Sequence, residues 1–131
     1  MKYTPEKIER LLPTDVFVFG TNQYGNHSGG AALLAEKHFG AIDGVPVGLA
    51  GKTYGIITTS YSGQVMTLEF IRDQVKVLYQ FAKYREELTF YVTKIGTGIA
   101  GYMIEDIANI FLSLESSRPS NIILPIEFTQ Q

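Results

Sequence analysis

The fold is decided by the stretch Val16-Phe17-Val18-Phe19-Gly20-Thr21-Asn22, which continues through Gln23-Tyr24-Gly25-Asn26-His27-Ser28 to Gly29-Gly30-Ala31. Four consecutive apolar residues are typical of a strand that is buried on both faces. The glycines that follow mark a loop with unusual backbone needs. An apolar helix over 31–39 comes next, and Gly40 stands where helices commonly stop. Together these features predict a strand, a glycine loop and a helix, the repeating unit of a parallel α/β fold.

The rest of the chain repeats this alternation of strands and helices. β-Branched and aromatic residues predict further strands over 53–59, 89–95 and 121–126. Apolar stripes predict helices over 67–87 and 103–114. A shorter helix is predicted to begin at Thr4-Pro5, with Ile8, Leu11 and Leu12 on one face. The sequence therefore predicts an α/β fold, a three-layer α/β/α sandwich around a mostly parallel sheet.

The order of the strands locates a ligand site. Right-handed crossovers favour a sheet with strands 16–20 and 89–95 side by side at its centre. Strand 53–59 then flanks one side and strand 121–126 the other, so the direction of chain progression reverses between the two central strands. A crevice opens at such a point, outside the carboxyl ends of the strands. We expect the loops that follow these two strands to form the ligand site.

Composition narrows the classes of function. The 131 residues fit a single domain, 1–131, and contain no cysteine, which excludes disulfides, thiol catalysis and Cys-based zinc sites. No His, Asp and Glu cluster has metal-ligand spacing, so neither a metal nor another bound cofactor is expected. There are 11 Lys and Arg against 13 Asp and Glu, so no direct binding of nucleic acid is expected. Without a signal peptide or a long apolar run, we expect a cytoplasmic protein that does not insert in a membrane.

The second glycine-rich loop is Gly96-Thr97-Gly98-Ile99-Ala100-Gly101-Tyr102. Glycines let an anion approach backbone N–H groups without a Cβ in the way. Neither loop contains Lys or Arg, so main-chain donors would hold a phosphate, and a diphosphate that bridges both loops fits better than a monophosphate. The loop also matches the G-x-G-x-x-G pattern of Rossmann NAD(P)-binding proteins. That alternative lacks its acidic residue about 20 positions further on.

The two loops together resemble the macrodomain family, most closely the small macrodomain-like proteins of bacteria and phages. In that family, one strand ends in an Asn-bearing loop with consecutive glycines before a small-residue helix. A later strand ends in a Ser/Thr-Gly-Ile/Val-x-Gly-Tyr-type loop. The residues that carry the resemblance are Phe19 to Asn22, Gly29 to Ala32, and Ile95 to Tyr102.

The resemblance implies a small-molecule ligand, ADP-ribose or a related nucleotide diphosphate, and in some members hydrolysis at the distal ribose. It implies that Asn22 touches the distal ribose and that Gly29, Gly30 and Ala31 line that end. Diphosphate donors would come from the second loop, and Tyr102 would form a wall. The ligand-binding residues that follow are Gly20, Thr21, Asn22, Gly29, Gly30, Ala31, Thr97, Gly98, Ile99, Ala100, Gly101 and Tyr102.

For several candidate residues, the sequence alone leaves both a functional and a structural interpretation open. His27 could act as a general base on a water beside the distal ribose, with Asn22 as the second catalytic residue, or be an ordinary loop histidine. Thr58 could contact ribose or phosphate, or only satisfy loop backbone. The glycines of the second loop could serve close helix–sheet packing alone. The alternative for the whole chain is a non-enzymatic protein-interaction module of the same fold.

Overall fold

A five-stranded, mostly parallel sheet forms the centre of the molecule. We describe a computed structural model of the chain, over residues 2–25, 30–60, 62–98 and 100–130. The strands are β1 (Asp15–Asn22), β2 (Gly48–Ala50), β3 (Thr53–Thr59), β4 (Thr89–Val92) and β5 (Ile122–Ile123), in the order β2-β3-β1-β4-β5. β1 pairs in parallel with both β3 and β4, and β4 with β5. The predicted order of the four parallel strands is therefore confirmed.

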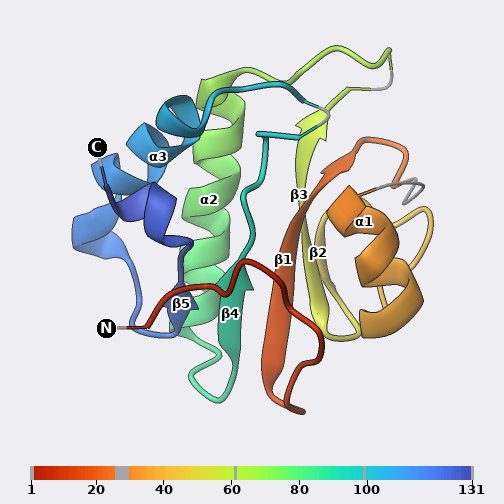
Figure 1. Cartoon of the computed structure of the whole chain (residues 1–131), viewed down its shortest axis with the longest axis vertical. Coiled ribbons are helices and arrows are strands. Elements are labelled where there is room, and N and C mark those ends of the chain that lie inside the picture. Colours follow the sequence, from red (N-terminus) through yellow and green to blue (C-terminus); the bar gives the residue numbers. More distant parts are fainter. Residues whose placement is uncertain (1, 26–29, 61, 99, 131) are drawn as a thin grey trace.

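Helices cover both faces of the sheet, as the predicted sandwich requires (Figure 1). One face carries α2 (Leu68–Lys83) and α3 (Ile104–Ser113), and the other carries α1 (Gly30–Leu34), which continues as a π-helical turn, η1 (Ala35–Phe39). Gly40 ends this turn with a left-handed φ of 87°, as predicted. Two short 3-10 turns, η2 (Glu115–Ser117) and η3 (Ile126–Thr129), flank β5.

Two apolar cores follow from the alternation of side chains along β1. Val16 and Val18 face α2 and α3 in the larger core, whereas Phe17 and Phe19 face α1 in the smaller one. Because successive strand residues point to opposite faces, a run of four apolar residues is what a strand between two helical layers needs. The described residues contain no helix that is long and apolar enough to cross a membrane.

The predicted N-terminal helix is wrong. Residues 2–12 contain no helix or strand, and Figure 1 shows this segment crossing the sheet toward the start of β1. The Thr4 amide donates to the Leu124 carbonyl at 2.8 Å and its hydroxyl donates to the Ile123 carbonyl at 3.1 Å. These bonds use the groups that would have capped a helix. Ile8 and Leu11 still pack against the smaller core, so their apolar spacing served packing rather than helix formation.

Other predicted elements differ only in length. The strand predicted over 89–95 ends at Val92, that over 121–126 comprises Ile122–Ile123, and helix 67–87 ends at Lys83. β2 was not predicted. It is antiparallel to β3 and covers only the first half of its outer edge.

A glutamine side chain protects the next part of that edge. The Ile57 amide donates to Gln74 Oε1 at 2.8 Å, and Gln74 Nε2 donates to the Ile57 carbonyl at 2.7 Å. Beyond it, the Met66 amide donates to the Thr58 carbonyl at 2.8 Å. An unpaired sheet edge invites association with other chains, so Gln74 substitutes for a strand that is missing here.

Candidate functional site

The two glycine loops start from neighbouring parallel strands, as predicted. β1 and β4 pair from Asp15 opposite Thr89 to Val18 opposite Val92. Beyond these paired residues, the two segments that follow β1 and β4 still lie close together. A Cβ atom placed on Gly20 would lie 3.7 Å from the Gly96 nitrogen and 3.2 Å from Thr58 Oγ1. The carboxyl ends of β1 and β3 and the start of the second loop therefore meet at Gly20, the position where chain progression reverses.

Within the second loop, some amides are already bonded and others are not. The Thr97 amide donates to the Lys94 carbonyl at 3.3 Å, and the Gly101 amide donates to the Gly98 carbonyl at 3.0 Å. The Tyr102 amide donates to the Gly96 carbonyl at 2.9 Å. No described residue accepts a hydrogen bond from the amides of Gly96, Gly98 or Ala100. Gly98 and Ala100 therefore keep the donors that an anion needs, whereas the predicted donor at Gly101 is used in a turn.

The glycines of this loop differ in their surroundings. A Cβ atom on Gly96 would lie 2.9 Å from Ile107 Cδ1, and its φ is 76°, so this glycine serves the packing of α3 on the sheet. A Cβ atom on Gly98 would have no neighbour within 4 Å among the described residues, and Gly98 does not have a left-handed φ. Gly101 is equally open but has a φ of 81°. Ile99 lies outside the described residues.

The described part of the first loop is held by the segment before β2. The Gly25 amide donates to the Asn22 carbonyl at 2.9 Å, and the Gly25 carbonyl accepts from the Gly44 amide at 2.9 Å. Gly25 has a φ of 70°, and a Cβ there would lie 2.6 Å from the Val45 nitrogen. Asn22 is half-buried and is the last residue of β1, at the carboxyl end of the strand.

The remaining candidates in the first loop divide between described and undescribed positions. His27 and Gly29 lie outside the described residues. Gly30 is the first residue of α1, and Ala31 is exposed beside it. The structure thus places Asn22 at one end of the loop and Ala31 at the other.

The threonine hydroxyls of the site point to backbone oxygens. The buried Thr58 donates from Oγ1 to the Thr21 carbonyl at 3.3 Å. Thr21, also buried, donates to the Asn22 carbonyl at 3.4 Å, and Thr97 donates to the Lys94 carbonyl at 2.7 Å. For Thr58, the geometry favours the reading in which the hydroxyl satisfies loop backbone.

Tyr102 joins the second loop to the segment that follows β3. Its hydroxyl donates to the Met66 carbonyl at 2.6 Å, and its half-buried ring packs against the larger core. The Ser60 amide donates to the Gln64 carbonyl at 2.7 Å, which turns this segment back toward the site. The described residues of this segment, Ser60 and 62–66, thus form a third wall. The sequence predicted that the end of the strand, from Thr58 to Ser60, lies next to the crevice. It did not predict the part from Ser62 to Met66, although Ser62-Gly63 after a strand signals a loop.

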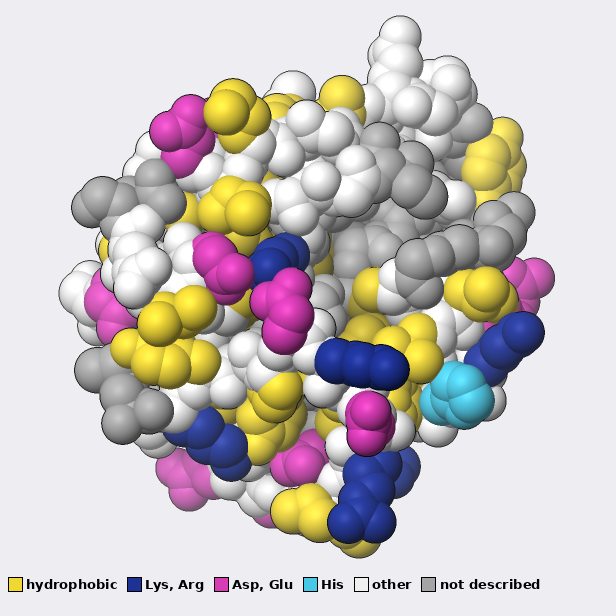
Figure 2. Space-filling model, in the orientation of Figure 1, with side chains coloured by type: hydrophobic (Ala, Val, Ile, Leu, Met, Phe, Trp, Pro, Cys, Tyr) yellow, Lys and Arg dark blue, Asp and Glu magenta, His cyan; other side chains and the backbone are white. Residues whose placement is uncertain are grey.

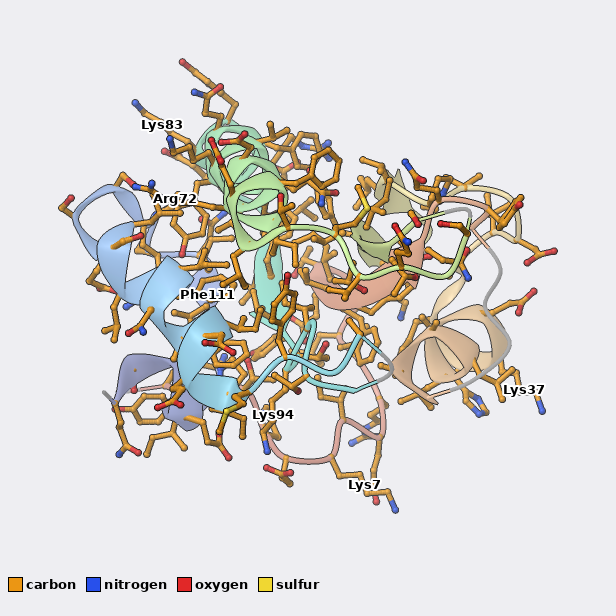
Figure 3. The ribbon with its side chains drawn as sticks, turned by 90° about the horizontal axis from the view of Figure 1, so that it is seen from above. Lys7, Lys37, Arg72, Lys83, Lys94 and Phe111 are labelled. Atoms are coloured by element: carbon orange, nitrogen blue, oxygen red, sulfur yellow. The ribbon has the colours of Figure 1, made fainter. Side chains whose placement is uncertain are left out.

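The cation nearest to the second loop in sequence is neutralised. Lys94 Nζ bonds Glu6 at 2.8 Å and Glu127 at 3.0 Å, and Figure 3 shows Lys94 beside the N-terminal segment. The hydrogen bonds to Glu6 and Glu127 raise the pKa of Lys94, and the bond from Lys94 lowers the pKa of Glu127. Figure 2 shows cations and anions interspersed on this face, with no large area of one sign. The described residues contain no cluster of three or more His, Asp or Glu that could hold a metal ion.

The fold is shared with a solved structure. The chain superposes on a protein of unknown function from Bacteroides thetaiotaomicron with a TM-score of 0.62 and 16% sequence identity, over 95% of this chain and 94% of that one. At this identity the similarity establishes the α/β fold alone. No protein-family model and no curated protein matches the chain.

Proposed function

We propose that the chain binds ADP-ribose or a related nucleotide diphosphate at the carboxyl ends of β1 and β4. The observation that carries this proposal is the open backbone at Gly98, whose amide has no acceptor among the described residues and whose Cβ position is empty. The first loop starts at Gly20, where a Cβ would be 3.7 Å from the Gly96 nitrogen. A ligand that rests on Gly98 is therefore within reach of both loops.

The charge distribution favours a ligand held by main-chain donors. Neither loop contains Lys or Arg, and Lys94 is bonded to two carboxylates. Main-chain N–H groups recognise the position of oxygen atoms, and a diphosphate presents more of them, over a longer span, than a single phosphate. The resemblance of both loops to macrodomains favours an ADP-ribose-like nucleotide.

A Rossmann-type reading of the second loop fits less well. In that fold, an acidic side chain after the loop bonds the ribose of the dinucleotide. Neither acidic residue near the expected spacing is free for this role, because Glu127 bonds Lys94 at 3.0 Å and Glu115 bonds Arg118 at 2.9 Å. We therefore prefer the macrodomain-like interpretation.

Hydrolysis at the distal ribose is the finer part of the proposal. Asn22 would position the ribose, and His27 would take a proton from the attacking water. The test is release of ADP-ribose from a modified protein or nucleic acid by wild type, Asn22→Ala and His27→Ala. Equal release by all three proteins would contradict these roles.

Binding is tested by calorimetry with ADP-ribose, ADP, NAD and AMP. We expect heat with the three diphosphates and weaker binding of AMP, which has one phosphate. Absence of heat with all four ligands at high micromolar protein would overturn the proposal.

A second candidate, a protein-interaction module, is favoured by a separate surface. Val47, Phe70 and Val77 are 46%, 38% and 58% exposed, and they line a groove of 240 Å³ over β3 and α2. Exposed apolar side chains in such a groove are a feature of partner surfaces. Under this candidate, Gly98→Glu leaves partner capture intact.

Because the chain contains no cysteine, we also propose a reducing, cytoplasmic location, which cell fractionation tests.

A further inference from the structure

A cavity of 230 Å³ adjoins the proposed nucleotide site. Ala31, which follows the first glycine loop, lines one side of it, and Thr93 and Lys94, which precede the second loop, line another. The N-terminal segment closes it through Pro5 and Ile8. The elements that carry both glycine loops are therefore also walls of this cavity, although Gly98 and Ala100 do not line it.

Most of the cavity wall is apolar. Pro5, Ile8, Phe17, Leu34 and Pro125 contribute carbon surface from the N-terminal segment, β1, α1 and the stretch after β5. A neutral group gains from burial against such surface, whereas an ion loses its hydration there.

The polar groups of the wall are bonded within the protein. Thr93 Oγ1 donates to the Val18 carbonyl at 2.8 Å, and Thr4 Oγ1 donates to the Ile123 carbonyl at 3.1 Å. Lys94 holds Glu6 and Glu127, and Lys7, which also lines the cavity, has an 85% exposed side chain that pairs with Glu9 at 3.8 Å. The cavity therefore offers shape and apolar contact rather than charge, which favours an uncharged occupant.

Size limits that occupant further. A buried apolar cavity of about 150 Å³ accommodates a benzene molecule. A volume of 230 Å³ thus fits a larger planar group, one aromatic ring with substituents or two fused rings.

We propose that this cavity receives an uncharged planar ring carried on the distal ribose of the bound nucleotide diphosphate. The inference rests on the proposed function, because the resemblance places the distal ribose at Gly30 and Ala31. Ala31 belongs to the cavity wall, so a ring attached to that ribose lies at its mouth. The substrate class is then a diphosphate with a nucleoside at each end, rather than free ADP-ribose.

Calorimetry with three ligands shows whether a ring on the distal ribose increases the affinity. ADP-ribose has no ring on its distal ribose, diadenosine diphosphate carries adenine there, and NADH carries an uncharged dihydronicotinamide. Burial of the ring predicts that diadenosine diphosphate and NADH bind about tenfold more tightly than ADP-ribose, or better.

Leu34→Trp tests whether the ring enters the cavity, since the larger side chain fills it from α1. Pro5→Trp fills it from the N-terminal segment and serves if Leu34→Trp does not fold. Leu12→Trp is the matched control, because Leu12 is 68% exposed and does not line the cavity. We expect the filled variants to bind all three ligands with the affinity of ADP-ribose and the control to keep the tenfold preference.

Each outcome separates the inference from the proposed function. If ADP-ribose binds as tightly as the other two ligands, the inference is overturned and the proposed function stands. A preference that survives both filled variants also overturns it, because the ring then lies elsewhere. If none of the three ligands binds, the proposed function itself has failed.

Discussion

Gly98→Glu tests the proposed function at the residue on which the proposal mainly rests. The structure leaves space for the side chain, since no other described residue lies within 4 Å of a Cβ atom at Gly98 and the residue does not have a left-handed φ. We therefore expect the unfolding free energy to change by no more than about 0.5 kcal/mol. A carboxylate about 5 Å from a bound phosphate, at an effective dielectric constant between about 20 and 80, costs roughly 1 to 3 kcal/mol. Affinity for ADP-ribose should fall by about 5- to 150-fold from charge repulsion alone.

Two further variants separate charge from size. Gly98→Gln has the same length without the charge, so the difference in affinity between Gln and Glu measures the repulsion. Gly98→Ala adds only the Cβ and reports how closely the ligand approaches the backbone. Calorimetry gives the affinities, and thermal unfolding confirms that the variants remain folded. Wild-type affinity in a folded Gly98→Glu protein would refute the assignment of the second loop as the phosphate site.

Three other predictions concern stability. Gln74→Leu removes the side chain that bonds an amide and a carbonyl on the edge of β3, so chemical denaturation should show that the free energy of unfolding falls by about 1 to 3 kcal/mol. The control Gln80→Leu, on the exposed side of α2, should show almost no change. The buried Tyr79 hydroxyl has no hydrogen-bond partner among the described residues, so Tyr79→Phe should leave stability unchanged or raise it by up to about 1 kcal/mol, and a clear loss of stability would contradict this. Lys94→Met removes ion pairs that lower the pKa of Glu127 from 4.5 and raise that of Lys94 from 10.5. The variant should therefore lose most stability relative to wild type between pH 4.5 and pH 10.5, and the loss should shrink as the pH falls below 4.5 or rises above 10.5. A loss that does not depend on pH would show that the ion pairs contribute nothing to stability.

The sequence predicted the elements whose patterns are local and long. The short apolar run from Val16 to Phe19, followed directly by glycine, favoured a buried strand, and its pairing with the strand at Thr89 followed from crossover rules. The Thr4-Pro5 pattern failed because the amide and hydroxyl of Thr4 bond the carbonyls of Leu124 and Ile123, which are far away in sequence and which no local pattern reports. β2 has three residues, too few for a pattern, and exists because β3 offers an edge.

Within the site, the sequence predicted the location of both loops but not the role of each residue. Gly96 and Gly98 are identical letters two positions apart, yet one packs against Ile107 and the other faces open space. The bond from Tyr102 to Met66 joins residues that are far apart in sequence, so no local pattern reports it. Long-range contacts of this kind decide which residues of a predicted loop are structural and which remain available to a ligand.

The ion pairs of Lys94 link the stability of the fold to the chemistry of the proposed site. Glu6 comes from the N-terminal segment and Glu127 from η3, so one ammonium holds two distant parts of the chain against the end of β4. The same contacts balance the positive charge nearest to the second loop in sequence. An anion at Gly98 then gains mainly from amide dipoles, which act over a shorter range than a net charge. A site of this kind gains little from a single phosphate that reaches one loop and more from a diphosphate that touches both, which is why we favour the longer ligand.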